Sequence, residues 1–440
     1  MTQLAQWTPE QIASLAPDEQ VAKAGRGLAR PAKWQTLGTN DSAVWGEIKG
    51  SGKDPYRVAI DLAGPAFKCS CPSGKKPCKH AIGLFFAAQA NSGALTAGEP
   101  PDWVAEWLAK RQATAERKAQ KAAEPSAVDA AAQAKRAARR EDLVQQGIDA
   151  LTLWLADLVR QGLSDLPARP RSYWETQAAR LVDAQAPGLA RHVREMSAIP
   201  YSGEGWPARL LDRLGRLHLL LEAYARLDTL PADMQEEVRT QVGWPQDQAA
   251  LLAEPGVRDR WLVLSVQETT EDKLRVQSTW LWGAITHQAA LLLDFAAPMQ
   301  NFTLNLPHGM ALDAELVFFT APAPHRALLK TRAGVEPIAA LPGYPTLAAA
   351  IAATSATLTR SPWIERFLWP LEAVIPTPHA EQWYIQDVEG HTMPMNLSPL
   401  EGWRLLALSG GHPLTLVAEW DREKLTPLSV WTGKALVGLN

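Results

Sequence analysis

The stretch FKCSCPSGKKPCKHAIGLFFA, residues 67–87, contains every cysteine of the 440-residue chain. Three cysteines and one histidine stand in it in the order Cys69-x-Cys71-x6-Cys78-x-His80. An odd number of thiols cannot all pair as disulfides within one chain, and disulfides are rare in a reducing compartment. Thiolates and imidazole are the ligands that zinc prefers in proteins. The stretch therefore predicts a metal site.

The spacing allows all four side chains to meet at one point. Residues i and i+2 of an extended segment point to the same side, so Cys69 and Cys71 can present both sulfurs together. A loop rich in Pro and Gly at 72–77 can bring Cys78 and His80 back to them. Three thiolates and one imidazole complete a tetrahedral site, with Zn–S near ~2.3 Å and Zn–N near ~2.0 Å. Because no coordination position is left for water, we expect one structural zinc ion per chain.

Two other interpretations, a buried cysteine cluster without metal and a redox-active cysteine pair, explain the cysteine pattern less well than a zinc site does. A buried cysteine cluster beside an unrelated histidine gives no reason for C-x-C and C-x-H to occur together in a chain without further cysteines. A redox role usually uses C-x-x-C, which the stretch lacks. In a module with so small a core, zinc is expected to contribute on the order of ten kcal/mol to folding.

The flanking residues predict a small fold around the site. Residues 56–62 (YRVAIDL) alternate between apolar and polar side chains, which indicates a strand with one buried face. Residues 43–50 (AVWGEIKG) can pair with it as a hairpin, with the turn at 50–55. Residues 81–90 read as a helix whose Ile82 and Phe85 can pack on the hairpin.

These residues resemble a SWIM-type zinc finger, whose pattern is C-x-C, a variable loop and then C-x-H. The resemblance covers residues 43–88, and all four ligand positions match: Cys69, Cys71, Cys78 and His80. The whole chain looks like bacterial SWIM zinc finger family proteins, which carry this module near the N-terminus. The resemblance implies a ββα zinc fold that binds DNA or protein. In bacteria it suggests association with MoxR-type AAA ATPases and von Willebrand A domain proteins.

The chain as a whole is expected to be an α+β multidomain protein, with a small ββα zinc module, a helical middle domain and a β-rich C-terminal domain. Pattern and composition divide it into a helical lead-in (1–42), the finger (43–88), a charged Ala-rich linker (89–141), a helical domain (142–256) and a β-rich domain with inserted helices (257–440). The linker has few large apolar residues, so we expect it to be a solvent-exposed helix or partly disordered.

Within these domains the patterns predict particular elements. Leucines and other apolar residues from Val144 to Leu158 step by three and four, which is one stripe of a helix. Residues 172–175 (SYWE) match a capping box. In the β-rich domain we expect strands that include 403–409 (WRLLALS), helices at 346–356 and 362–374, and hairpin turns at 389–390 and 410–411.

Charge is unevenly distributed along the chain. Residues 1–141 carry 20 Lys and Arg against 14 Asp and Glu, whereas the remainder carries 24 against 33. Lysines near the finger could contact the phosphates of a nucleic acid, or could merely offset the charge of −1 that three thiolates leave on Zn²⁺. The candidate nucleic-acid contacts are Lys49, Lys53, Lys75, Lys76 and Lys79, and Lys68 would join them in offsetting the charge.

The remaining motifs leave function open. Nothing at the N-terminus resembles a secretory signal and no apolar run is long enough for a membrane span, so a cytoplasmic location is expected. A nucleophile elbow is absent, and the pair His192 and Glu195 is more typical of a solvated helix face than of a metal site. The leading hypothesis is a non-enzymatic adaptor whose finger docks a protein partner. The alternatives are a DNA-binding regulator and an enzyme within residues 257–440.

Overall fold

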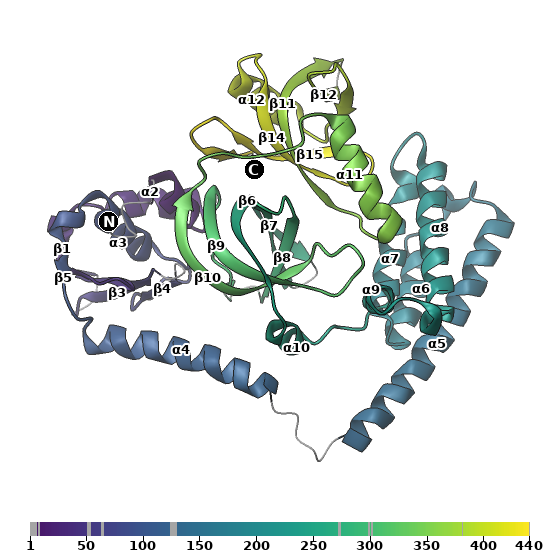
Figure 1. Ribbon diagram of the computed structural model, residues 1–440, viewed down its shortest axis with the longest axis horizontal. Coiled ribbons are helices and arrows are strands. Elements are labelled where there is room, and N and C mark those ends of the chain that lie inside the picture. The colour runs from purple at the N-terminus through teal and green to yellow at the C-terminus, as the bar shows by residue number, and fades with distance from the viewer. Residues whose placement is uncertain are drawn as a thin grey trace.

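The computed structural model describes residues 7, 9–50, 54–62, 66–123, 130–271, 274–297, 300, 302–380 and 382–439. Figure 1 shows an N-terminal module, a helical bundle and a β-rich part that lies between them. The α+β fold class predicted from the sequence, with its zinc module, helical middle and β-rich end, is confirmed. No helix of the described residues is long and apolar enough to cross a membrane.

The N-terminal module contains a five-stranded sheet in the order β4-β3-β2-β1-β5. The predicted hairpin is present, with Val44 opposite Ile60. The sheet is wider than expected, because β1 lies in the segment predicted as a helical lead-in and pairs with β2. Its elements are α1 (Pro9–Ser14), α2 (Glu19–Arg26), β1 (Trp34–Thr39), β2 (Ala43–Ile48), β3 (Tyr56–Asp61), β4 (Ala66–Cys69), α3 (Lys79–Ala90) and β5 (Thr96–Ala97).

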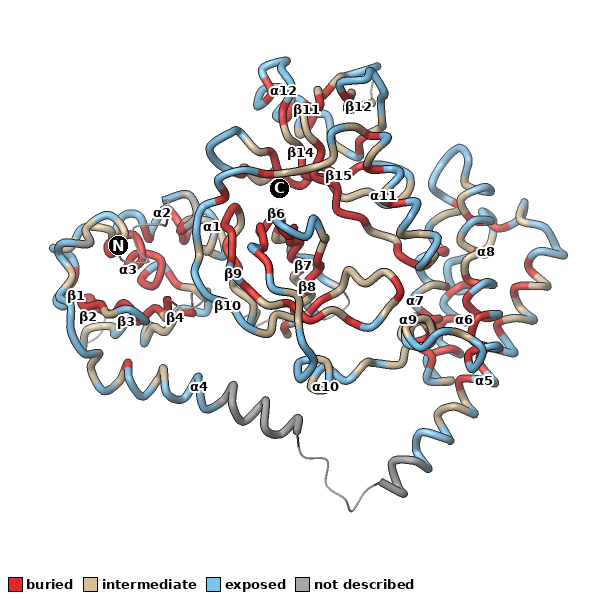
Figure 2. The backbone as a smooth tube through the Cα atoms, in the orientation of Figure 1, coloured by how far each residue is buried: buried red, intermediate tan, exposed pale blue. Residues whose placement is uncertain are grey.

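Both faces of this sheet are covered. Alternate residues such as Val44 and Ile60 share a core with α3, while their neighbours Trp45 and Ala59 share another with Val104. Val104 belongs to α4 (Asp102–Ala123), which begins inside the predicted linker. Figure 2 shows the buried residues of α3 and of the strands beside it. The first turns of α4 are therefore part of the module and are not a free linker.

The helical bundle is built on the predicted apolar stripe, whose residues from Val144 to Leu158 are buried. The predicted capping box at 172–175 is wrong, because α6 begins at Ser172 without a side-chain cap and Glu175 binds Arg194 of α7 at 2.7 Å. The helices are α5 (Ala130–Gln161), α6 (Ser172–Asp183), α7 (Pro187–Met196), α8 (Trp206–Ala225) and α9 (Ala232–Val242), and the short α10 (Gln248–Ala253) follows.

Two antiparallel sheets form the β-rich part. The first has the order β10-β9-β6-β7-β8, and a bridge between Leu291 and Arg326 brings its two edges together into a barrel-like curl. The second has the order β13-β12-β11-β14-β15-β16. The two sheets share a core, across which the Ser429 hydroxyl donates to the Leu264 carbonyl at 2.8 Å.

The strands of the first sheet are β6 (Val257–Glu271), β7 (Leu274–Gly283), β8 (Ala289–Ala296), β9 (Met310–Phe318) and β10 (Ala327–Pro337). Those of the second are β11 (Phe367–His379), β12 (Gln382–Gln386), β13 (Thr392–Pro394), β14 (Leu414–Trp420), β15 (Leu425–Trp431) and β16 (Leu436–Gly438). The inserted helices are α11 (Leu347–Arg360) and α12 (Pro399–Ser409).

Three predictions in this region are wrong. Residues 403–409 belong to α12, because Ser398 and Glu401 form a capping box and Gly410, at a φ of 57°, ends the helix. Gly410 is thus a helix cap and not a hairpin turn. Residues 362–374 do not form a helix, since most of them belong to β11, where Pro370 lies opposite Val417. Proline in a helix interior would remove a donor and clash with the preceding turn.

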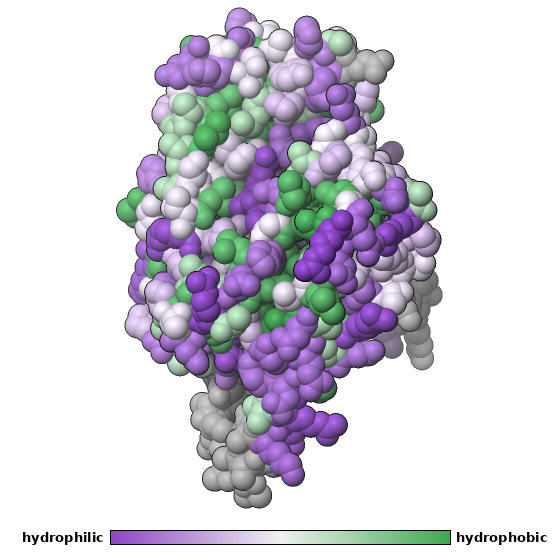
Figure 3. All heavy atoms as spheres, turned by 90° about the vertical axis from the view of Figure 1, so that its right-hand side faces the viewer, coloured by the Kyte–Doolittle hydropathy of each residue, from purple (hydrophilic) through white to green (hydrophobic). Residues whose placement is uncertain are grey.

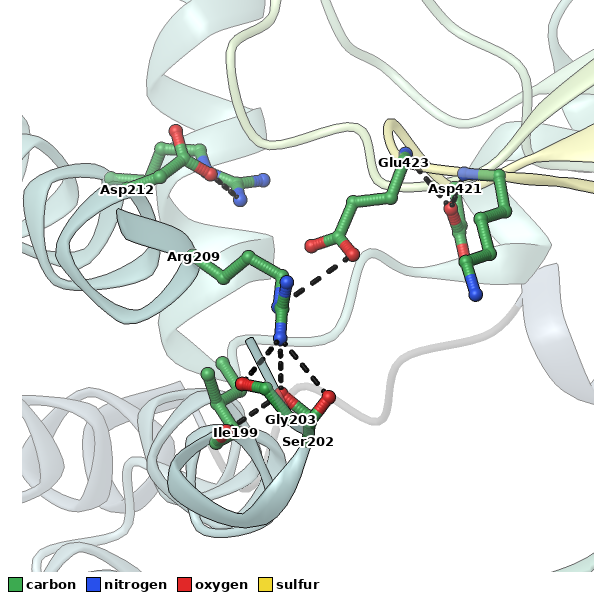
Figure 4. Close-up of polar contacts among 9 residues, drawn as sticks. Ile199, Ser202, Gly203, Arg209, Asp212, Asp421 and Glu423 are labelled. Carbon is green, nitrogen blue, oxygen red and sulfur yellow. Dashed lines mark hydrogen bonds and ion pairs between the residues drawn. The ribbon is translucent and has the colours of Figure 1, made fainter. Parts of the chain in front are cut away.

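A short segment before β11 joins the β-rich part to the bundle. Trp363 is buried in the bundle core, and its indole Nε1 donates to the Arg216 carbonyl at 3.1 Å. Figure 4 shows a second junction, in which Arg209 of α8 donates to the Ser202 carbonyl and hydroxyl and faces Glu423 of the β14–β15 turn at 3.8 Å. The bundle and the β-rich part are therefore held together by the buried side chain of Trp363 and by polar contacts around it.

Replacing Trp363 tests whether this side chain holds the β-rich part to the bundle. Trp363→Ala is expected to lower the free energy of unfolding by about 3–5 kcal/mol, the usual cost of removing a buried large aromatic side chain. The control Trp403→Ala removes a side chain that is 58% exposed on α12 and should cost less than about 1 kcal/mol. Guanidinium titration followed by circular dichroism measures both, and equal losses would contradict the anchoring role.

Candidate metal centre

The four predicted ligands come together at the junction of β4 and α3. Cys69 ends β4, and the ladder continues one residue further because the Ser70 amide donates to the Arg57 carbonyl at 3.0 Å. This keeps the C-x-C segment extended. Cys78 immediately precedes α3 and His80 lies in its first turn, as the spacing predicts. The end of the strand and the start of the helix thus place all four ligand side chains around one point.

The ligand atoms have the separations that a tetrahedral zinc site requires. The Nδ1 atom of His80 lies 3.9 Å from the Sγ atoms of Cys69 and Cys78. One ligand atom from each of the four residues lies within 4.8 Å of the others. Ordinary zinc bond lengths place sulfur and nitrogen about 3.6 Å apart in a tetrahedron, so only a small inward movement is needed. Three thiols and one imidazole therefore form a site for one structural zinc ion.

The surrounding packing holds the ligands in place. The ring of His80 lies against that of Tyr56 with centroids 5.1 Å apart, and Cys78 is buried. The first hydrogen bond of α3 runs from the Ile82 amide to the Cys78 carbonyl at 3.1 Å. Phe85, fully buried, anchors the same helix in the core. Metal and core therefore fix the same end of α3.

Without the metal, the three thiols have different affinities for protons. A hydrogen bond from the Cys69 thiol lowers the pKa of Cys78 to about 3 and correspondingly raises the pKa of Cys69. Burial raises the pKa of Cys71. With their pKa values raised, the Cys69 and Cys71 thiols keep their protons at neutral pH, and zinc must displace these protons.

The structure gives the finger lysines differing environments. Lys75 forms an ion pair with Asp18 at 2.6 Å, and Lys68 donates to the Trp103 carbonyl at 3.0 Å while lying over the rings of Trp103 and Trp107. The predicted contacts Lys49, Lys76 and Lys79 are exposed, and Lys53 lies outside the described residues. Sequence reasoning missed both lysine partners. The i, i+4 spacing of Trp103 and Trp107 was a signal that one face of α4 is buried.

The pair His192 and Glu195 is not a solvated face, because only 13% of the His192 side chain is exposed and burial lowers its pKa to about 4. Glu365 of the β-rich part brings a third potential ligand close to them. Arg213, however, forms an ion pair with that Glu365. We therefore assign this cluster to the junction between bundle and β-rich part.

The strand, the helix and the donor set around Cys69 and His80 together define a zinc finger module. Residues 56–89 match the SWIM zinc finger, and residues 139–242 match the SWIM-associated four-helix bundle domain. The chain therefore carries a SWIM zinc finger followed by the bundle associated with such fingers, which confirms the resemblance seen in the sequence. Comparison with curated proteins and with solved structures gave no match.

Loss of a ligand should release the metal. Cys78→Ser or His80→Ala is expected to abolish stoichiometric zinc and to expose residues 43–88 to protease, because metal binding supplies much of the folding free energy. The bundle and the β-rich part should stay folded. Lys79→Ala, which changes the exposed residue between the two ligands, is the control and should retain zinc. Metal analysis and limited proteolysis measure both properties, and a ligand variant with full zinc and unchanged protease resistance would refute the site.

Acid should also release the metal. Zinc binding displaces about two protons near neutral pH, since the raised pKa values of Cys69 and Cys71 keep both thiols protonated in the metal-free protein. Protons are then products of binding, so the zinc affinity should fall about 100-fold for each pH unit between about pH 8 and 7. Competition with a chromogenic chelator at several pH values measures this slope, and an affinity independent of pH would contradict the protonation pattern.

Proposed function

We propose that the protein is a cytosolic, non-enzymatic adaptor whose zinc-stabilised finger module docks a protein partner. The observation that carries this proposal is the burial of α3. Zinc fingers that read DNA insert a helix into the major groove. Residues 80–88 of α3 are all buried, so this helix has no free face to insert.

Close packing explains that burial. The strands β2, β3 and β4 lie on one side of α3, and α1 and α2 lie against it as well. Glycines allow the helices to approach, because a Cβ on Gly25 would lie 2.7 Å from Ile82 and one on Gly83 would lie 2.7 Å from Leu28. Freeing α3 for a groove would require α2 to leave the core. The module is better suited to present a rigid outer surface.

The electrostatics also favour a protein partner. Lys75 and Lys68 already have partners within the module. The chain carries a net charge of −3, which does not favour attraction to a polyanion. The exposed Lys49, Lys76 and Lys79 keep nucleic-acid binding as the second candidate function, in which these residues would contact phosphates.

The bundle, on the other side of the β-rich part from this module, also exposes apolar side chains. Leu211 and Leu219 of α8 are 57% and 43% exposed, and Gly215 between them has open space above its backbone. These residues stand at i, i+4 and i+8 and so share one helix face. Figure 3 shows the side of the molecule to which the bundle belongs, where apolar side chains gather among polar ones. Exposed apolar patches commonly mark protein interaction sites.

A partner of the MoxR-type AAA ATPase or von Willebrand A class is the one we propose, on the strength of the SWIM resemblance. The zinc site supports the proposal because it stabilises the module that would dock. In this view the bundle and the β-rich part extend the interaction surface.

A capture experiment separates the two functions. Wild-type protein, Cys78→Ser and the double variant Lys76→Glu/Lys79→Glu are used to recover partners from native cytosol, with and without nuclease. An adaptor should lose its protein partners in Cys78→Ser and keep them in the lysine variant and after nuclease. Recovery that consists of nucleic acid, is removed by nuclease and is lost in the lysine variant would refute the adaptor function and support DNA binding.

A further inference from the structure

A cavity of about 340 Å³ lies in the β-rich part, between β7, β8, β11 and α11. In Figure 1, α11 lies on the side of the β-rich part that faces the bundle. The volume falls at the lower end of the range of small-molecule sites, and such sites occur preferentially between packed units. None of the four zinc ligands lines it. The cavity is therefore independent of the metal centre and of the docking function proposed for the finger.

Several large aromatic side chains line the cavity. Trp280, Trp282, Tyr344 and Trp369 all line it. The rings of Trp282 and Tyr344 pack edge to face with centroids 5.8 Å apart, so both are held rigidly. Trp369 is fixed as well, because its indole Nε1 donates to the Thr354 hydroxyl at 2.9 Å. Rigid aromatic walls favour a flat ring as ligand, since stacked or edge-to-face contacts add to the burial of apolar area.

One buried donor of the cavity wall lacks an acceptor. Trp282 is only 2% exposed, and its indole Nε1 has no hydrogen-bond partner among the described residues. A buried N–H without a partner costs about 1–3 kcal/mol relative to a satisfied one. The indole groups of Trp280 and Trp369, by contrast, both have acceptors within the protein. Trp282 thus indicates a ligand that brings an acceptor.

The charged groups of the cavity indicate the sign of that ligand. No acidic residue among the described residues lines it, whereas Arg360 and Arg366 both do. Glu419 neutralises Arg366 through two hydrogen bonds of 2.8 and 2.6 Å. Arg360, which is exposed at the edge of α11, donates to the Pro322 carbonyl and forms no ion pair with a described carboxylate. Burial also lowers the pKa of His325 to about 4, so this residue adds no charge at neutral pH.

We propose that this cavity binds a planar aromatic molecule that carries one carboxylate. The ring lies among the aromatic walls, and the carboxylate serves as the counter-charge of Arg360 and the acceptor for the buried donor of Trp282. A cationic ligand is disfavoured because the net charge of the lining is positive. A purely apolar ligand would leave the Trp282 N–H without a partner and would gain no ion pair with the exposed Arg360.

The position of the cavity links its occupant to the bundle. Ile364 and Arg366 line the cavity, while Trp363 and Glu365 contact the bundle through its core and through Arg213. Neighbouring residues of one short segment thus face the ligand and the bundle in alternation. A bound ligand would contact the segment that holds the two parts together.

Calorimetric titration of the full-length, zinc-loaded protein tests the proposal with three probes of the same ring: 2-naphthoate, 2-naphthylmethanol and 2-naphthylmethylamine. Naphthoate is expected to bind saturably at one site per chain, at least 10-fold more tightly than the alcohol and the amine. Ala353 lines the cavity, whereas its neighbour Ala352 is exposed on α11. Ala353→Phe should therefore weaken binding at least 10-fold, and the matched control Ala352→Phe should leave it unchanged.

Two further variants keep the test decisive if Ala353→Phe does not fold. Arg360→Gln should abolish the preference for naphthoate over the alcohol. Trp282→Phe, which keeps a ring and removes the N–H, should weaken naphthoate more than the alcohol. The proposal is overturned if naphthoate shows no saturable binding, if the alcohol or the amine binds as tightly, or if neither Arg360→Gln nor Trp282→Phe changes the preference.

Discussion

The N-terminal module depends on the zinc site, which joins an edge strand of the sheet to the start of a buried helix. Cys69 ends the outermost strand of the sheet, and Cys78 and His80 stand at the beginning of α3. One metal ion joins these two places. Because α3 is buried along almost its whole length, a displacement of its first turn would uncover the core beneath it. The small metal site therefore stabilises the much larger apolar interface between α3 and the rest of the module.

The cores of the finger sheet and of the bundle also depend on residues from neighbouring segments. The second face of the finger sheet is covered by α4, a helix in the segment predicted to be an exposed linker. The bundle core includes Trp363, which comes from the segment before β11. Neither the sheet nor the bundle completes its core from its own contiguous sequence. Function is accordingly expected at surfaces and cavities near the contacts between the parts, and the tryptophan-lined cavity of the β-rich part is bordered by the segment that contacts the bundle.

The zinc ligands could be predicted because their geometry is local. The period of a strand aligns Cys69 with Cys71, and the short loop leaves Cys78 and His80 few other places to lie. The partners of the nearby lysines could not be predicted in this way. Asp18 is 57 residues from Lys75 in sequence, and Trp103 is 35 residues from Lys68. No local period connects such residues, so a cluster of five candidate contacts could not be sorted into paired and exposed side chains.

The sequence by itself determined the zinc donor set, the β2–β3 hairpin and the buried stripe of α5, because each follows from a short repeat or period along the chain. Residues 362–374 and 403–409 are both apolar runs that suit either a strand or a helix. Only the tertiary structure decided the first, because pairing with β14 made it a strand. The second is a helix because of the local capping residues Ser398, Glu401 and Gly410, a signal that the sequence contains. The burial of α3, on which the proposed docking of a protein partner rests, was likewise decided by packing between distant segments, which local periodicity does not encode.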